Sequence, residues 1–113
     1  MATRYYISLK DPVRTRASGD FAFTSQGAEG FASELQDALR GTGLFERWRA
    51  TQEDPDAVDQ ALAATDPGAT VSGRQDDLHI DLIAVTSLPG SVFKHRLRLL
   101  AGSSWELRDV SAA

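Results

Sequence analysis

Hydrophobic and polar residues alternate near the N-terminus, over residues 4–9, where Tyr5, Ile7 and Leu9 fall on one side. A period of two in a segment rich in aromatic and β-branched residues predicts a strand. Residues 21–24 repeat the alternation with two phenylalanines on one side, and they predict a second strand. A polar loop separates the two segments, so we expect an antiparallel pair with a long connection.

The period changes to three and four over residues 25–40, which predicts an amphipathic helix. Ser25 is a suitable N-cap and Gly41 a suitable C-terminal stop. Two further short helical segments are predicted, one over residues 44–50 and one that starts at Asp54-Pro55. The apolar stripe of the main helix consists of Ala28, Phe31, Ala32, Leu35, Ala38 and Leu39.

The C-terminal third alternates again and predicts strands over residues 69–74, 78–87 and 105–110. Residues 91–100 fit two structures. As a strand joined to residues 78–87 through Pro89-Gly90, they pair apolar with apolar residues and place Asp81 opposite Arg98. As a helix they have an apolar stripe that contains Arg96, which fits poorly, so the strand is favoured. The helical stripe would be Val92, Phe93, Arg96, Leu97 and Leu100.

The expected order of elements is therefore β-β-α-α-β-β-β-β within a single domain, residues 1–113. Separate runs of helix and strand are typical of the α+β class. We expect an antiparallel sheet of about five to six strands, one main amphipathic helix and one or two short helices.

Composition excludes several classes of function. The chain has no cysteine, which excludes a disulfide framework, thiolate metal sites and a cysteine nucleophile. The net charge of −4 resides in residues 46–66, which hold six acidic and two basic side chains. This acidity argues against nucleic acid as a partner. No apolar run is long enough for a secretory signal or a membrane helix, so we expect a cytoplasmic protein without a membrane partner.

Polar side chains along the predicted sheet are one candidate ligand face. Asp77, His79 and Asp81 alternate on one strand, a pattern that can orient a general base or contribute metal ligands. Further ligands would have to come from elsewhere, so we interpret the pattern as an exposed polar stripe and expect no metal and no cofactor. Together with Arg96 and Arg98 from the neighbouring predicted strand, His79 and Asp81 form this alternative face.

A second candidate surface lies on the short helical segment after Gly41. Phe45 and Trp48 alternate there with Arg47 and Arg49. Tryptophan and arginine are enriched among residues that dominate binding energy at protein interfaces. We therefore take Phe45, Arg47, Trp48 and Arg49 as the candidate binding surface.

The sequence contains no catalytic motif such as a nucleophile elbow, a phosphate-binding loop or a zinc-protease helix. The first hypothesis is accordingly a small protein-interaction or regulatory module without catalytic residues, whose protein partner is unknown. If residues 105–110 form an exposed edge strand, this strand could also pair with its own copy in a homodimer. The alternative is a small-ligand-binding protein or enzyme that uses the polar sheet face of His79, Asp81, Arg96 and Arg98.

Overall fold

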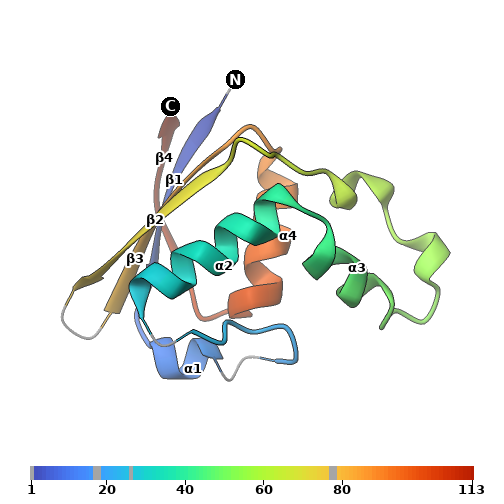
Figure 1. The fold of residues 1–113 in the computed structure, drawn as a ribbon, viewed down its shortest axis with the longest axis horizontal. Helices are drawn as coiled ribbons and strands as arrows, with labels where there is room; N and C mark the ends of the chain where they lie inside the picture. The colour runs from blue at the N-terminus through green and yellow to red at the C-terminus, as the bar shows by residue number, and fades with distance from the viewer. Residues whose placement is uncertain (1, 17–18, 26, 77–78) are drawn as a thin grey trace.

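The protein is described by a computed structural model that covers residues 2–16, 19–25, 27–76 and 79–113 (Figure 1). Four strands form one sheet, two long helices cover it, and shorter helical segments complete the chain. The elements in chain order are β1 (Thr3–Leu9), α1 (Pro12–Arg16), α2 (Ala28–Arg40), α3 (Gly43–Arg49), the 3-10 turns η1 (Pro55–Ala57) and η2 (Gln60–Ala63), β2 (Thr70–Asp76), β3 (His79–Thr86), α4 (Gly90–Ala101) and β4 (Glu106–Ala112).

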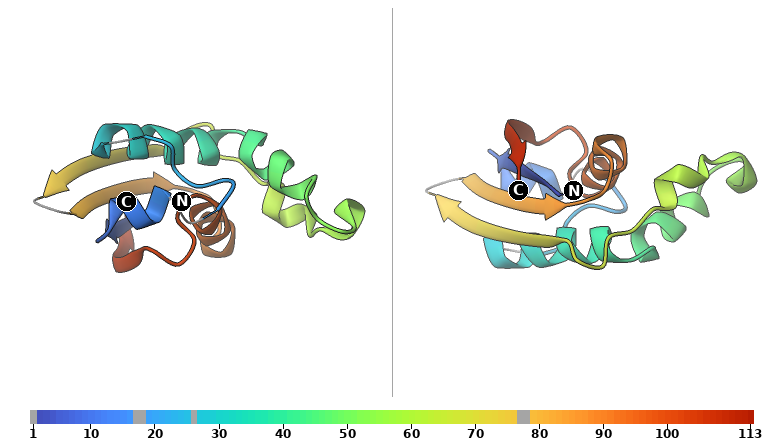
Figure 2. Two further views of the ribbon diagram at one scale, coloured as in Figure 1. Left: turned by 90° about the horizontal axis from the view of Figure 1, so that it is seen from below. Right: turned by 90° about the horizontal axis from the view of Figure 1, so that it is seen from above.

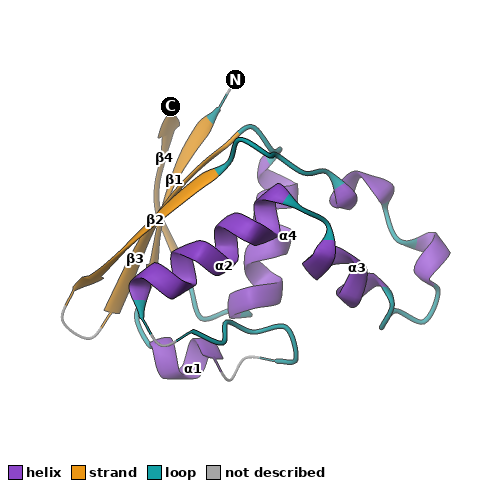
Figure 3. Ribbon diagram, in the orientation of Figure 1, coloured by secondary structure: helices purple, strands orange, loops and turns teal. Residues whose placement is uncertain are grey.

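The sheet is antiparallel throughout, and its strands lie in the order β2-β3-β1-β4. Helix α2 lies between β1 and β2 in the chain, and α4 lies between β3 and β4, so two β-α-β units interlock (Figure 3). This connectivity is the split β-α-β arrangement called ferredoxin-like. The predicted α+β class with an antiparallel sheet is confirmed, whereas the sheet has four strands rather than five to six.

One face of the sheet packs against α2 and α4 and forms the core. The side chains on this face are buried in both central strands: Tyr5, Ile7 and Leu9 of β1, and Ile80, Leu82 and Ala84 of β3. The six apolar residues predicted for the stripe of α2 are all buried as well. Tyr5 stacks on Phe93 of α4 with ring centroids 4.1 Å apart, which joins the sheet to the second helix. Alternation on β1 and β3 and the helical period on α2 therefore identified the two layers correctly.

The predicted strand over residues 91–100 is wrong, because these residues form helix α4. Val92, Phe93, Leu97 and Leu100 are buried along one stripe, and Arg96 is buried among them. Its guanidinium donates to three backbone carbonyls, whereas its buried Nε has no hydrogen-bond partner among the described residues. The three bonds offset the cost of burying a cation in a position that apolar periodicity alone disfavours. The proposed hairpin through Pro89-Gly90 is therefore absent from the described structure.

Residues 21–24 were predicted as a strand and instead run as an irregular segment along the helices. Both hydrogen-bonding edges of β1 are occupied by β3 and β4, so β1 has no free edge with which this segment could pair. Its alternation arises because Phe23 enters the core, where it stacks on Phe31 with centroids 4.4 Å apart. The Phe23 N–H donates to the Leu100 carbonyl at 2.9 Å, a backbone bond to α4 rather than to the sheet.

The segment between α2 and β2, which contains α3, η1 and η2, extends beyond the sheet (Figures 1 and 2). The helix predicted to start at Asp54-Pro55 consists of the two 3-10 turns. Among the described residues no helix is both long enough and apolar enough to cross a membrane. Strand β4 is an edge strand, as the homodimer hypothesis requires, and that hypothesis stays a prediction.

Candidate functional site on the open face of the sheet

The face of the sheet opposite α2 and α4 carries a groove of about 830 Å³. Strand alternation sends polar and partly apolar side chains to this face, while their neighbours in the chain enter the core. Residues from all four strands contribute, and β1 and β3 form the floor. The side chains that define the groove include Tyr6, Ser8, Lys10, Ser72, Arg74, Asp76, His79, Asp81, Ile83 and Arg108.

The strand register places these side chains in rows across the sheet. Ser8 of β1, Asp81 of β3 and Arg74 of β2 form one row, since Asp81 is the partner of both neighbours. Tyr6 and Ile83 belong to the next row, and Ile83 is 37% exposed although it is a large aliphatic residue. The groove thus combines an apolar patch with charged groups of both signs.

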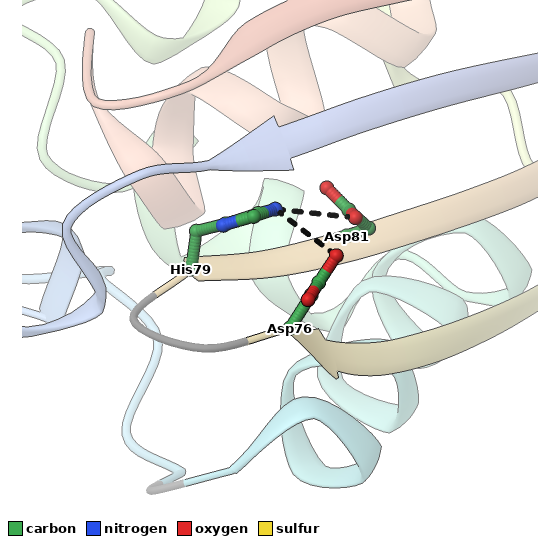
Figure 4. Close-up of side chains that lie close together, drawn as sticks. All are labelled: Asp76, His79 and Asp81. Atoms are coloured by element: carbon green, nitrogen blue, oxygen red, sulfur yellow. Dashed lines mark ion pairs between the residues drawn. The ribbon is translucent and has the colours of Figure 1, made fainter.

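Three potential metal ligands meet at one end of the groove (Figure 4). His79 Nε2 lies 3.4 Å from Asp81 Oδ2 and 3.9 Å from Asp76 Oδ2. One ligand atom from each residue falls within 4.8 Å of the other two. His79 and Asp81 share a face because they are two positions apart on β3, and Asp76 is the residue opposite His79 on β2.

A cluster of ion pairs flanks the groove where β1 and β4 meet. Lys10 Nζ lies 2.8 Å from Glu106 Oε2, and Arg108 Nη1 lies 3.5 Å from Glu106 Oε1. The hydrogen bond and the positive charge of Lys10 hold the pKa of Glu106 below its ordinary value. Lys10 and Arg108 are thus partly engaged, whereas Arg74 forms no ion pair with any residue that the structure describes.

The structure brings together only part of the predicted polar face. His79 and Asp81 lie in the groove, but Arg96 is buried in α4 on the other side of the sheet, and Arg98 is exposed on that helix. The predicted pairing of Asp81 with Arg98 is wrong for the same reason. Asp77, the third residue of the predicted polar stripe, lies outside the described residues.

Asp76 was missed in the sequence. The strand predicted over residues 69–74 stopped short of it, whereas β2 continues through Asp76. Gln75 and Asp76 are polar, and a strand with both positions exposed has no apolar alternation that marks its end. Only the register between β2 and β3 shows that Asp76 faces His79.

The second predicted surface, on α3, is partly structural. Phe45 is fully buried, which removes it from any binding surface. Trp48 is half-buried, and its ring lies edge-on to His95 with centroids 4.4 Å apart. Arg49 donates from Nε to the Pro55 carbonyl at 3.0 Å and fastens the following turn. Arg47 is the residue of this set that stays exposed, with its guanidinium carbon 5.9 Å from the Phe21 ring centroid.

His95 of α4 supports the attachment of α3. Its Nδ1 is buried and has no hydrogen-bond partner among the described residues. Burial, together with the positive charges of Arg96 and Arg98, lowers the pKa of His95 below its ordinary value. Burial and the neighbouring arginines therefore favour the neutral imidazole, which packs against the Trp48 ring.

The fold and the groove define a small α+β protein in which none of the described helices covers the groove-bearing face of the sheet. Comparison with known proteins adds nothing to this description, since no family model, curated protein or solved structure was found to match the chain.

Proposed function

We propose that this chain is a small binding module that holds a small polar ligand on the open face of its sheet. The observation that carries the proposal is the groove of about 830 Å³, whose lining comes from paired strands of a sheet fixed by the core behind it. Ligand sites in proteins commonly have volumes of about 300–1,000 Å³ and are largely formed before the ligand binds.

The lining favours a ligand with an anionic group and an apolar, preferably planar part. Arg74 is exposed and forms no ion pair with a described residue, so its guanidinium is available to a carboxylate or a phosphate. Tyr6 and the partly exposed Ile83 provide an apolar floor in the adjacent row. Such a ligand would connect the charged row to the apolar row across β1 and β3.

A thermal-shift screen of small aromatic carboxylates and phosphates tests this proposal. A ligand raises the melting temperature of the native chain because it binds the folded state alone. We expect Arg74→Ala to abolish the shift and Arg98→Ala to retain it, since Arg98 is also an exposed arginine but lies on helix α4, in the opposite layer. A ligand whose effect is the same in both variants would refute the assignment to this groove.

A second candidate function is protein interaction through α3, and the position of Arg47 favours it. Arg47 is exposed beside the half-buried Trp48, on the segment that extends beyond the sheet (Figure 2). Exposed arginine next to an aromatic ring is typical of residues that dominate interface energy. Without Phe45 this surface is smaller than the sequence indicated, and a partner would contact Arg47 and the exposed part of Trp48.

Crosslinking followed by affinity capture distinguishes this function from ligand binding. Arg47→Ala should reduce capture of a partner without unfolding the chain, because the side chain is exposed. Arg14→Ala serves as the control, since Arg14 is exposed on α1. Equal capture by both variants would remove α3 from consideration.

A further inference from the structure

We propose that Asp76, His79 and Asp81 form a binding site for a divalent first-row metal ion such as Zn²⁺ or Mn²⁺. This inference does not depend on the organic ligand proposed above. It rests on the positions of three side chains at one end of the groove, where β2 and β3 lie side by side (Figure 4).

The distances between the donor atoms suit a metal ion. Zinc ligands lie about 2.1 Å from the metal, so two ligands of a tetrahedral site are about 3.4 Å apart. His79 Nε2 lies 3.4 Å from the Asp81 carboxylate and 3.9 Å from the Asp76 carboxylate. The imidazole nitrogen is thus the shared neighbour of both acids, and one donor atom from each of the three residues lies within 4.8 Å of the other two.

The ligand set also suits the metal chemically. Imidazole nitrogen favours zinc and related ions, and carboxylate oxygen is shared by zinc and manganese. Two carboxylates supply two negative charges, which balance a divalent ion with a neutral imidazole. Their side chains are 51% and 41% exposed and that of His79 is 37% exposed, so coordination positions remain open toward the groove.

The backbone fixes the ligands in relation to one another. His79 and Asp81 project from the same face of β3, and Asp76 projects from the paired position on β2. All three therefore belong to hydrogen-bonded strands, which hold a site more firmly than loops do. The open coordination positions face the same groove that Arg74 and Ser8 line.

Direct contacts of the His79 imidazole with the two acids are the competing explanation. Nε2 can donate only one proton, however, and a carboxylate oxygen of each acid lies near it. No lysine or arginine that the structure describes forms an ion pair with Asp76 or Asp81. A divalent cation would bind both carboxylates and the imidazole at the same time.

Titration of the chelator-treated full chain with Zn²⁺ or Mn²⁺ alone tests the proposal. We expect the melting temperature to rise by about 5 °C at a metal concentration about ten times the dissociation constant. Isothermal titration calorimetry should show that His79→Gln and Asp81→Asn each weaken binding at least about tenfold, within the range for lost metal-site contacts. Asp37→Asn is the charge-matched control, since Asp37 is exposed on α2 away from the groove.

The outcomes separate this site from the organic-ligand proposal. Arg74→Ala should leave metal binding in place while it abolishes anion binding, and failure of one does not imply failure of the other. Circular dichroism checks that each variant folds. Because two ligand residues are replaced separately, the test still holds if one of the two variants fails to fold. The metal site is refuted if neither ion binds at about 1 mM, or if both ligand variants bind as tightly as Asp37→Asn.

Discussion

Replacement of Arg96 by methionine is the perturbation that most directly tests how this fold is held together. Arg96 is fully buried in α4, and its guanidinium donates to the carbonyls of Ala38, Leu62 and Ala64 at 2.6, 2.8 and 2.8 Å. Ala38 lies in the last turn of α2, where carbonyls have no partner within the helix. One side chain therefore caps α2 and binds both η2 and the residue that follows it.

The expected cost of Arg96→Met follows from the three acceptors. Methionine preserves most of the apolar stem but donates no hydrogen bond. The Ala38 carbonyl is buried, and leaving a buried acceptor unpaired costs about 2 kcal/mol. The other two bonds are partly buried, so their carbonyls can turn toward water, and each loss costs about 1 kcal/mol.

Arg96→Met also removes the cost of burying a cation, and this offsets part of the loss from the three hydrogen bonds. The cost shows in the pKa of Arg96, which burial lowers. We expect a net loss of about 3 kcal/mol in the free energy of unfolding, which corresponds to a fall of roughly 10 °C in melting temperature.

Urea denaturation monitored by tryptophan fluorescence measures the loss, and Arg98→Met on the exposed side of the same helix is the matched control. Amide hydrogen exchange adds a local measurement. Protection should fall most in residues 58–66, because Leu62 and Ala64 lose their contact with α4. An Arg96→Met protein within about 0.5 kcal/mol of the native chain would show that desolvation cancels the bonds, and the reasoning would be refuted.

Two further predictions concern packing and pH. A Cβ on Gly73 would overlap the Ala28 carbonyl, so Gly73→Ala should lower the free energy of unfolding by about 1–3 kcal/mol, as measured by urea denaturation. Gly43→Ala is the control and should be neutral, because no neighbouring atom lies within 4 Å of its Cβ. Burial lowers the pKa of His95, so the unfolded chain takes up this proton more readily than the folded chain. Stability should therefore fall as pH drops below about 6.5, the ordinary histidine pKa, and His95→Gln should reduce that slope in denaturation measured at several pH values.

The layers of the fold could be predicted because their signals are local. The stripe of α2 and the alternation on β1 and β3 depend on residues within one element, and a single buried face dictates each pattern. Helix α4 could not be assigned from the pattern of its own residues. Arg96 contradicts an apolar stripe unless its acceptors are known, and they come from Ala38, Leu62 and Ala64, which lie 58, 34 and 32 residues away. An arginine within an apolar helical stripe is therefore a sequence signal for a buried guanidinium that donates to backbone carbonyls.

The candidate site was half predictable for a related reason. His79 and Asp81 share a strand, so alternation placed them on one face without knowledge of the fold. Asp76 joins them only through the pairing of β2 with β3, and Arg74 enters the groove through the same register. Arg96 and Arg98 were assigned to a strand that is in fact helix α4, so their predicted places on the polar sheet face are wrong.

The overall acidity of the chain does not determine what the groove binds. The net charge of −4 is accounted for by residues 46–66, which include the end of α3 and the two 3-10 turns and do not line the groove. Within the groove Arg74 is balanced by Asp81 in the same row, so the local sign depends on what occupies the end that holds His79. A divalent metal ion there would balance the charges of Asp76 and Asp81 and leave the positive charge of Arg74 uncompensated. Metal binding would then favour anion binding beside Arg74, and the anion would favour the metal by the same factor, because coupling between two sites is reciprocal.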